Sequence, residues 1–135
     1  MDLIPIRLHK IMQSHAYTVI ILGNDTKRFA IYTDPHVGES IQLYLTEEPK
    51  SRPHTHDFLN GILKGLEVKV VQVIIEDLED TVYFSRLFLT KEIGDETHVL
   101  EIDARPSDSL IMALMNNAKL YCRKSVMDKA VAVED

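Results

Sequence analysis

The chain has 135 residues, a formal charge of −6, and contains 45% hydrophobic and 27% charged residues. This length and balance are typical of one folded domain with a core of its own. The negative charge argues against a protein that coats nucleic acid through a broad basic surface, because such binding needs many Lys and Arg contacts to phosphates. It is compatible with a nuclease, which can place carboxylates around a metal and hold phosphate with few cations.

A single cysteine and the N-terminal residues indicate the compartment. Cys122 alone excludes an internal disulfide and a cysteine-based zinc site, and it fits a reducing environment. The N-terminus has no basic segment followed by a long apolar core, and no stretch approaches the roughly 20 apolar residues of a membrane span. We therefore expect a cytoplasmic protein without a membrane segment.

The first third of the chain is predicted to form an antiparallel sheet. Alternating or β-branched apolar runs, typical of strands, cover residues 4–11, 17–22 and 29–33. Gly23, Asn24 and Asp25 suit a turn between the last two runs. After Pro35, the apolar spacing predicts a helix over 38–47.

The rest of the chain is predicted to mix strands and helices. Helical apolar spacing covers residues 55–66, 107–117 and 125–131. Strand-like runs cover residues 68–75, 82–89, 98–102 and 119–122. Together these elements predict a compact α+β domain over residues 1–135, with a largely antiparallel or mixed sheet packed by three to four helices.

Two short polar segments echo each other, each directly before a predicted helix. Residues 52–57 read RPHTHD and residues 103–108 read DARPSD. In each, a hydroxyl suits the N-cap (Thr55, Ser107), and a carboxylate enters the first helical turn. Capping does not require the arginines or the histidines, so each segment either only starts a helix or also contributes to a polar site.

The pair His54 and His56 has two structural interpretations. In an extended segment both rings would point to the same side and could share a zinc ion. If Thr55 is the N-cap, His56 has already entered the helix and the rings diverge. We favour the second geometry, in which His56 is a candidate for proton transfer near neutral pH.

Carboxylates near the predicted strand ends could form the other half of a site. Asp103, Arg105 and Asp108 could converge where a strand leads into a helix whose N-terminal N–H groups favour phosphate. Asp77 follows an apolar strand in the acidic link 76–80, which is either a solvated hairpin connection or part of the site. If its strand lies beside the one that ends at Asp103, the two carboxylates could share Mg²⁺.

Four blocks, in order and approximate spacing, resemble the bifunctional nuclease domain family. They are RPHTHDFL (52–59), VIIEDL (73–78), TVYFSRL (81–87) and IDARPSDS (102–109). The resemblance covers about residues 38–130, whereas residues 1–35 match only in their strand-like pattern. His54 and Ser109 depart from the residues usual in the family, and Glu39 is a further site candidate in a segment similar to the family's.

The resemblance implies an α+β fold, self-association into dimers or larger assemblies, and cleavage of both DNA and RNA. The family's polar positions, which we expect to form one surface cluster, fall on Arg52, Thr55, His56, Asp57, Asp77, Asp103, Arg105, Ser107 and Asp108.

These positions suggest three roles in phosphodiester hydrolysis. Asp77, Asp103 and Asp108 would bind Mg²⁺ or Mn²⁺ and activate water. His56 and Asp57, with the same Asp103 and Asp108, form the predicted catalytic group. Phosphate would be held by Arg52, Arg105, Thr55 and Ser107. No organic cofactor is expected.

Two other interpretations of the polar cluster remain open from the sequence. The chain could be a nonenzymatic regulatory or interaction module whose cluster binds an anionic ligand or a protein partner. Alternatively, the cluster could be structural and tie two helix starts together through bonds between Arg and carboxylates.

Overall fold

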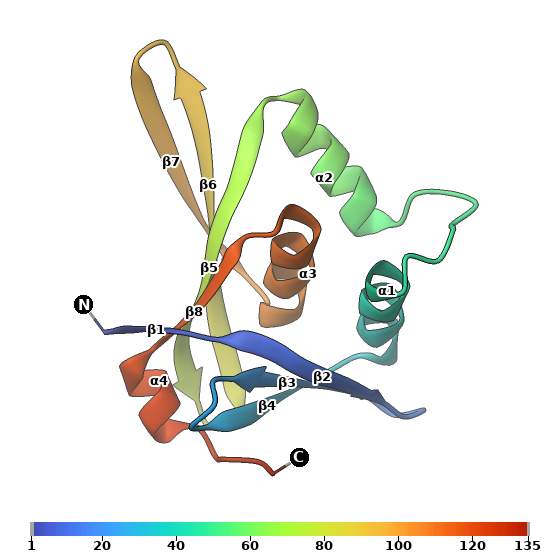
Figure 1. Ribbon diagram of the computed structural model, residues 1–135, viewed down its shortest axis with the longest axis vertical. Coiled ribbons are helices and arrows are strands. Elements are labelled where there is room, and N and C mark those ends of the chain that lie inside the picture. The colour runs from blue at the N-terminus through green and yellow to red at the C-terminus, as the bar shows by residue number, and fades with distance from the viewer. Residues whose placement is uncertain (1, 135) are drawn as a thin grey trace.

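The computed structural model describes residues 2–134, which form two sheets around a central helix (Figure 1). The larger sheet has the order β1-β8-β5-β6-β7, and all its neighbours are antiparallel except β5 and β8. Its strands are β1 (Leu3–Pro5), β5 (Val68–Glu79), β6 (Val82–Ile93), β7 (Glu96–Ala104) and β8 (Lys119–Arg123). The smaller sheet is antiparallel and consists of β2 (Arg7–Gln13), β3 (Thr18–Gly23) and β4 (Arg28–Thr33).

Helices lie around these sheets, and the α+β class predicted from the sequence is confirmed. They are α1 (Pro35–Leu45), α2 (Thr55–Gly65), α3 (Pro106–Asn116) and α4 (Lys124–Lys129). Figure 1 shows α3 at the centre, whereas the β6–β7 hairpin projects away from the other elements. In the described part of the chain, no helix is long and apolar enough to cross a membrane.

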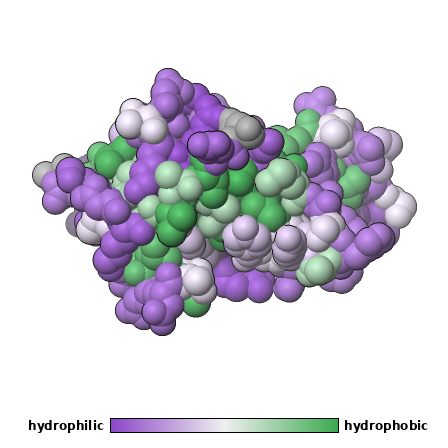
Figure 2. Space-filling view, turned by 90° about the horizontal axis from the view of Figure 1, so that it is seen from below, coloured by the Kyte–Doolittle hydropathy of each residue, from purple (hydrophilic) through white to green (hydrophobic). Residues whose placement is uncertain are grey.

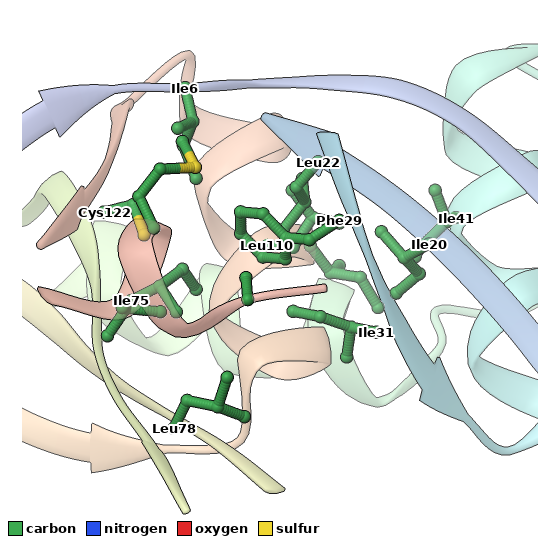
Figure 3. Packing of buried hydrophobic residues seen from close by; sticks show 14 of the residues in the cluster. Ile6, Ile20, Leu22, Phe29, Ile31, Ile41, Ile75, Leu78, Leu110 and Cys122 are labelled. Atoms are coloured by element: carbon green, nitrogen blue, oxygen red, sulfur yellow. The ribbon is translucent and has the colours of Figure 1, made fainter. Parts of the chain in front are cut away.

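The main core joins the two sheets through α3. Leu110 of α3 is 2% exposed and packs in one cluster with Phe29 and Leu22 of the smaller sheet (Figure 3). Ile75 and Cys122 contribute from the larger sheet. Burying such apolar side chains is the main favourable term in folding.

A second, smaller cluster lies between α3 and the far part of the larger sheet. Met112 and Ala113 on α3 pack there with Leu87 and Leu89 of β6. Successive residues of α3 therefore serve two clusters, because a helix places neighbouring residues on different sides. The second cluster forms part of the surroundings of the hollow described below.

The predicted strand over residues 4–11 is wrong in one respect, because the chain changes sheets within it. Leu3–Pro5 pairs with β8, whereas Arg7–Gln13 pairs with β3. Between them Ile6 is buried, and its N–H donates to the carbonyl of Leu120 at 3.0 Å. Pro5 has no N–H for a ladder bond, which suits the end of a strand.

Helix α1 and the β5–β6 hairpin differ from their predicted limits. The helix begins at Pro35, three residues before the predicted start, because proline is favoured at the first helical position. Gly38 is required there, since a Cβ would lie 2.3 Å from Thr18 Oγ1. In the hairpin, β5 continues to Glu79, so Asp77 lies within a strand and the acidic link predicted over 76–80 is reduced to Asp80 and Thr81.

The central position of Leu110 yields a prediction about stability. Leu110→Ala should lower the free energy of unfolding by about 2–5 kcal/mol, because it removes buried methyl groups and leaves a cavity. Urea unfolding followed by circular dichroism measures this change. Leu45→Ala is the matched control, since Leu45 is 46% exposed. Equal losses in the two variants would contradict the central role of α3.

Candidate functional site

The polar segments meet at a hollow between α2, α3 and the β6–β7 hairpin. Its volume is about 710 Å³. Most of its lining is aliphatic and comes from Leu59, Leu63, Leu87, Leu89, Ile102, Ala104 and Met112. Polar side chains lie at the end where α2 and α3 begin, namely Thr55, His56, Arg105 and Asp108. Asp103 also borders the hollow.

Asp108 joins the two segments through both of its carboxylate oxygens. Its Oδ1 lies 2.9 Å from Nε2 of His56, and its Oδ2 accepts a hydrogen bond from Nε of Arg105 at 2.9 Å. The side chains of His56 and Asp108 are 19% and 31% exposed, so this pair is half-buried. A second polar contact holds α2 against α3, because Asn116 Nδ2 donates to Asn60 Oδ1 at 2.9 Å.

Electrostatics keeps Asp108 ionised. Burial acts to raise the pKa of this carboxyl, but the hydrogen bonds from Arg105 and His56 outweigh it, and the pKa lies below its ordinary value. The site therefore offers a stable negative charge behind the imidazole ring. Such a carboxylate fixes the orientation and tautomer of a histidine.

The predicted N-caps are wrong at both helices. His54 is the N-cap of α2, so Thr55 is the first helical residue, and Arg105 is the N-cap of α3, since Pro106 occupies the first helical position. His56 therefore lies inside α2, as favoured above. Thr55 is exposed at the hollow, whereas Ser107 is 3% exposed and borders a different depression.

Asp57 lies outside the hollow and serves the start of α2. Its Oδ2 accepts hydrogen bonds from the backbone N–H of His54 at 2.8 Å and from Lys50 Nζ at 2.6 Å. The bond from Lys50 is the main reason why the pKa of Asp57 lies below its ordinary value. These bonds are the reciprocal half of a capping box rather than contacts to the other polar segment.

Asp103 and Asp77 are not brought together as the sequence suggested. Strand β6 separates β5, which contains Asp77, from β7, which contains Asp103. Oδ1 of Asp77 lies 3.7 Å from Nζ of Lys129. Asp103 pairs across the sheet with Arg86, and strand alternation directs its side chain away from the face of Ile102. Asp103 therefore reaches the border of the hollow without joining Asp108.

The remaining candidates lie at the surface, away from the hollow. Arg52 is exposed in the connection before α2, and Glu39 is exposed on α1. Within residues 2–134, no three His, Cys, Asp or Glu side chains gather as a metal site would require. The donors present thus do not form a complete metal site by themselves.

Sequence reasoning missed the contact that positions the start of α3. The hydroxyls of Ser85 and Ser109 lie 2.8 Å apart, and that of Ser85 also donates to the carbonyl of Ala104. Both serines are almost fully buried. A signal was present, because Ser109 replaces the residue usual in the family and Ser85 is polar within an apolar strand. Their bond fixes Arg105 and Asp108 relative to β6.

Comparison with known proteins identifies the family. A sequence model of the bifunctional nuclease domain matches residues 19–135, and the chain belongs to this family. It is also similar to two proteins of Mycobacterium tuberculosis, named Uncharacterized protein MT1877 (strain CDC 1551 / Oshkosh) and Uncharacterized protein Rv1829 (strain ATCC 25618 / H37Rv). Each is 29% identical over 123 residues, which cover 90% of this chain and 71% of the relative.

The lowered pKa of Asp108 predicts a stability loss that depends on pH. Asp108→Asn should lower the free energy of unfolding by about 1–2 kcal/mol at pH 7, since it weakens two charge-assisted hydrogen bonds at a half-exposed site. The stability that comes from the lowered pKa of Asp108 is fully present above the ordinary Asp pKa of about 4. It is lost as the pH falls through the pKa of Asp108 in the folded state. The difference between the two proteins should therefore be smaller near pH 3 than at pH 7. Urea unfolding at both pH values measures this.

Asp103→Asn provides the control for this experiment. Asp103 is exposed, and the substitution should leave stability almost unchanged at both pH values. A constant difference between wild type and Asp108→Asn across the pH range would show that the ion pairs contribute little.

Proposed function

We propose that the chain hydrolyses phosphodiester bonds in DNA and RNA at the polar end of the hollow. Membership of the bifunctional nuclease domain family supports the class of reaction. The observation that carries the choice of site is the contact of His56 and Arg105 with opposite oxygens of Asp108. These contacts place His56, which can transfer protons, beside Arg105, a cation that can stabilise phosphate charge.

In this proposal His56 transfers the protons. When Nε2 carries a proton and donates it to Asp108, Nδ1 has a lone pair that can accept a proton from water. The resulting hydroxide equivalent attacks phosphorus, and the bond from phosphorus to the leaving oxygen breaks. The imidazolium, stabilised by the Asp108 carboxylate, then returns a proton to the leaving oxygen or to solvent.

Arg105 and the starts of two helices would hold the phosphate. The Arg105 guanidinium uses Nε for Asp108, and its side chain is 67% exposed. The N-terminal ends of α2 and α3 add backbone N–H groups whose partial positive charge favours an anion. Thr55 adds a hydroxyl at the border of the hollow. We place Arg52 at a more distant part of the bound strand.

A divalent cation is the second part of the proposal. Mg²⁺ and Mn²⁺ are commonly held by one or two carboxylates together with substrate phosphates and water. Asp108 is the carboxylate at the polar end, whereas strand alternation turns the Asp103 side chain away from the face of Ile102. Because these residues form no complete site alone, we expect a metal to bind together with nucleic acid, where it would stabilise phosphate charge.

Self-association is a separate proposal, supported by an exposed apolar stripe on α2 and its C-cap residue. Phe58, Ile62 and Leu66 follow one another at helical spacing and are 66%, 44% and 58% exposed. Contiguous apolar surface of this kind is typical of protein interfaces. We propose that two copies of the chain associate through this stripe.

A binding module is the second candidate function. It is favoured by the hollow itself, whose lining is mainly aliphatic and contains no Phe, Tyr or Trp side chain on which a base could stack. A nuclease site that holds only the phosphate backbone does not need so large an aliphatic lining. The polar end of the hollow supports the nuclease proposal, and its apolar lining supports the binding module.

The nuclease proposal predicts a loss of cleavage in two variants. His56→Ala and Arg105→Ala should each lower the rate of cleavage of single-stranded DNA and RNA by about 100-fold or more, because each removes a group that acts in the transition state. Fluorescent oligonucleotides measure the rate with EDTA and with added Mg²⁺ or Mn²⁺. A rate restored only by the metals would support the metal proposal.

Lys124→Ala is the control for this assay, since its partner Asp128 lies on α4, away from the hollow. It should cleave at the wild-type rate after the same purification. If all variants cleave equally, the activity belongs to a contaminant and the proposal is wrong.

The self-association proposal predicts a change in mass. Light scattering after size exclusion should give about twice the 15.4 kDa of one chain for the wild type. Phe58→Asp should shift the mass toward that of one chain, because burying an unpaired charge in the interface destabilises the association. Val82→Asp, on an exposed site of β6, should keep the wild-type mass. A wild type that stays at 15.4 kDa at every concentration would contradict the proposal.

A further inference from the structure

Strand β7 is a long sheet edge that is neither shortened nor bulged. It has nine residues, and in the described structure it pairs with β6 on one side only. Its register with β6 runs without a bulge from Ala104 to Glu96, and it contains no proline. The opposite edge of the same sheet, β1, has only three residues. Native proteins usually shorten, bulge or cover an edge, because its unpaired N–H and C=O groups can bind another strand.

The hollow lies directly beside this edge. Ile102 and Ala104 of β7 line it, and Leu87 of β6 lies next to Ile102 across the ladder. Because side chains alternate along a strand, Leu100 shares the face of Ile102, and it is 56% exposed. A strand added to β7 would continue the sheet and direct every second side chain toward this face.

Helix α2 provides the opposite wall for those side chains. Its Leu59 and Leu63 line the hollow across from the β6–β7 face. A groove between an edge strand and a helix recognises an extended peptide in two ways. The edge contributes main-chain hydrogen bonds, and the pockets select alternate side chains.

The polar end adds a preference for charge. The Arg105 side chain is 67% exposed, and within residues 2–134 its Nε donates to Asp108 whereas its terminal guanidinium nitrogens make no hydrogen bond. It lies at the end of the groove that follows Ala104, the last residue of β7. An acidic group on the bound segment would find its partner there.

Exposed apolar side chains alone would not select this surface. Figure 2 shows that such side chains also gather on the face seen from below, and Tyr32, Val82 and Val131 are exposed elsewhere in the chain. What distinguishes the groove is that an unpaired edge, an aliphatic hollow and an exposed cation lie together.

We propose that an extended segment of a partner protein binds here by pairing with β7. The segment carries aliphatic side chains at alternate positions, which enter the hollow, and an acidic residue at the end near Arg105. The segment would occupy the hollow and the Arg105 side chain that the nuclease proposal assigns to nucleic acid, so this inference rests on the second candidate function, a binding module. The peptide titration tests it without a cleavage assay.

The test is an NMR titration of the ¹⁵N-labelled protein with defined synthetic peptides. The probe is an acetylated heptapeptide in which leucine alternates with threonine and a glutamate stands at one end, made with the glutamate first and with it last. At about 1 mM peptide, which detects even weak complexes, one of the two should shift the amide signals of β7 and of Leu59 and Leu63. Alternate β7 amides should also become protected from hydrogen exchange.

A backbone-modified peptide separates strand pairing from simple apolar contact. The same sequence with N-methyl groups at alternate residues keeps every side chain but loses main-chain donors, and it should bind at least about tenfold more weakly. Equal binding of the two peptides would overturn the proposal. An absence of β7 shifts with both directions of the unmodified peptide would also overturn it.

Two protein variants test the groove and its charge. Leu59→Glu should weaken binding by about tenfold or more, because it places a charge against the aliphatic side chains. Arg105→Glu should weaken the binding of the glutamate peptide and strengthen the binding of the same peptide with lysine at that end. Val131→Glu, at an exposed site that does not line the hollow, should bind like the wild type. Failure of the charge exchange, or an equal loss of binding in Val131→Glu, would overturn the proposal.

Discussion

The two-sided packing of α3 is the constraint on which the rest of the structure depends. Leu110 joins the core between the two sheets, whereas Met112 faces the cluster beside the hollow. The first turn of the same helix carries Asp108, which contacts α2. Because interiors are close-packed, α3 cannot shift to improve one of these contacts without disturbing the others. The shape of the hollow is therefore determined by the core.

Asp108 shows how structural and chemical roles can share one group. Its bonds to His56 and Arg105 link two helix starts, and the same bonds orient an imidazole and a guanidinium at the hollow. The carboxylate stays charged because these bonds outweigh its partial burial. A structural interpretation and a catalytic interpretation of the cluster thus use the same contacts, and only measurements that separate stability from turnover distinguish them.

The sequence was informative about local structure and family membership, and less informative about relations between strands. Apolar periodicity predicted α2 and α3, and the motif blocks predicted the confirmed family. The insertion of β6 between Asp77 and Asp103, and the side of β7 on which Asp103 lies, depend on sheet order and register, which no local pattern specifies. The N-caps were misplaced by one or two residues, because Pro106 and the Asp57 contact to His54 outweighed the hydroxyl preference.

The pairing of β1 with β8 has a consequence for the order in which the chain acquires its structure. Ile4 lies opposite Cys122, so two segments far apart in the sequence must meet to complete one side of the larger sheet. Contacts this distant in sequence carry a large loop-closure entropy and slow folding. During synthesis, β1 emerges long before β8 and lacks this partner until the chain has been made through Arg123. The three-stranded sheet, built from adjacent segments, can form long before the five-stranded sheet closes.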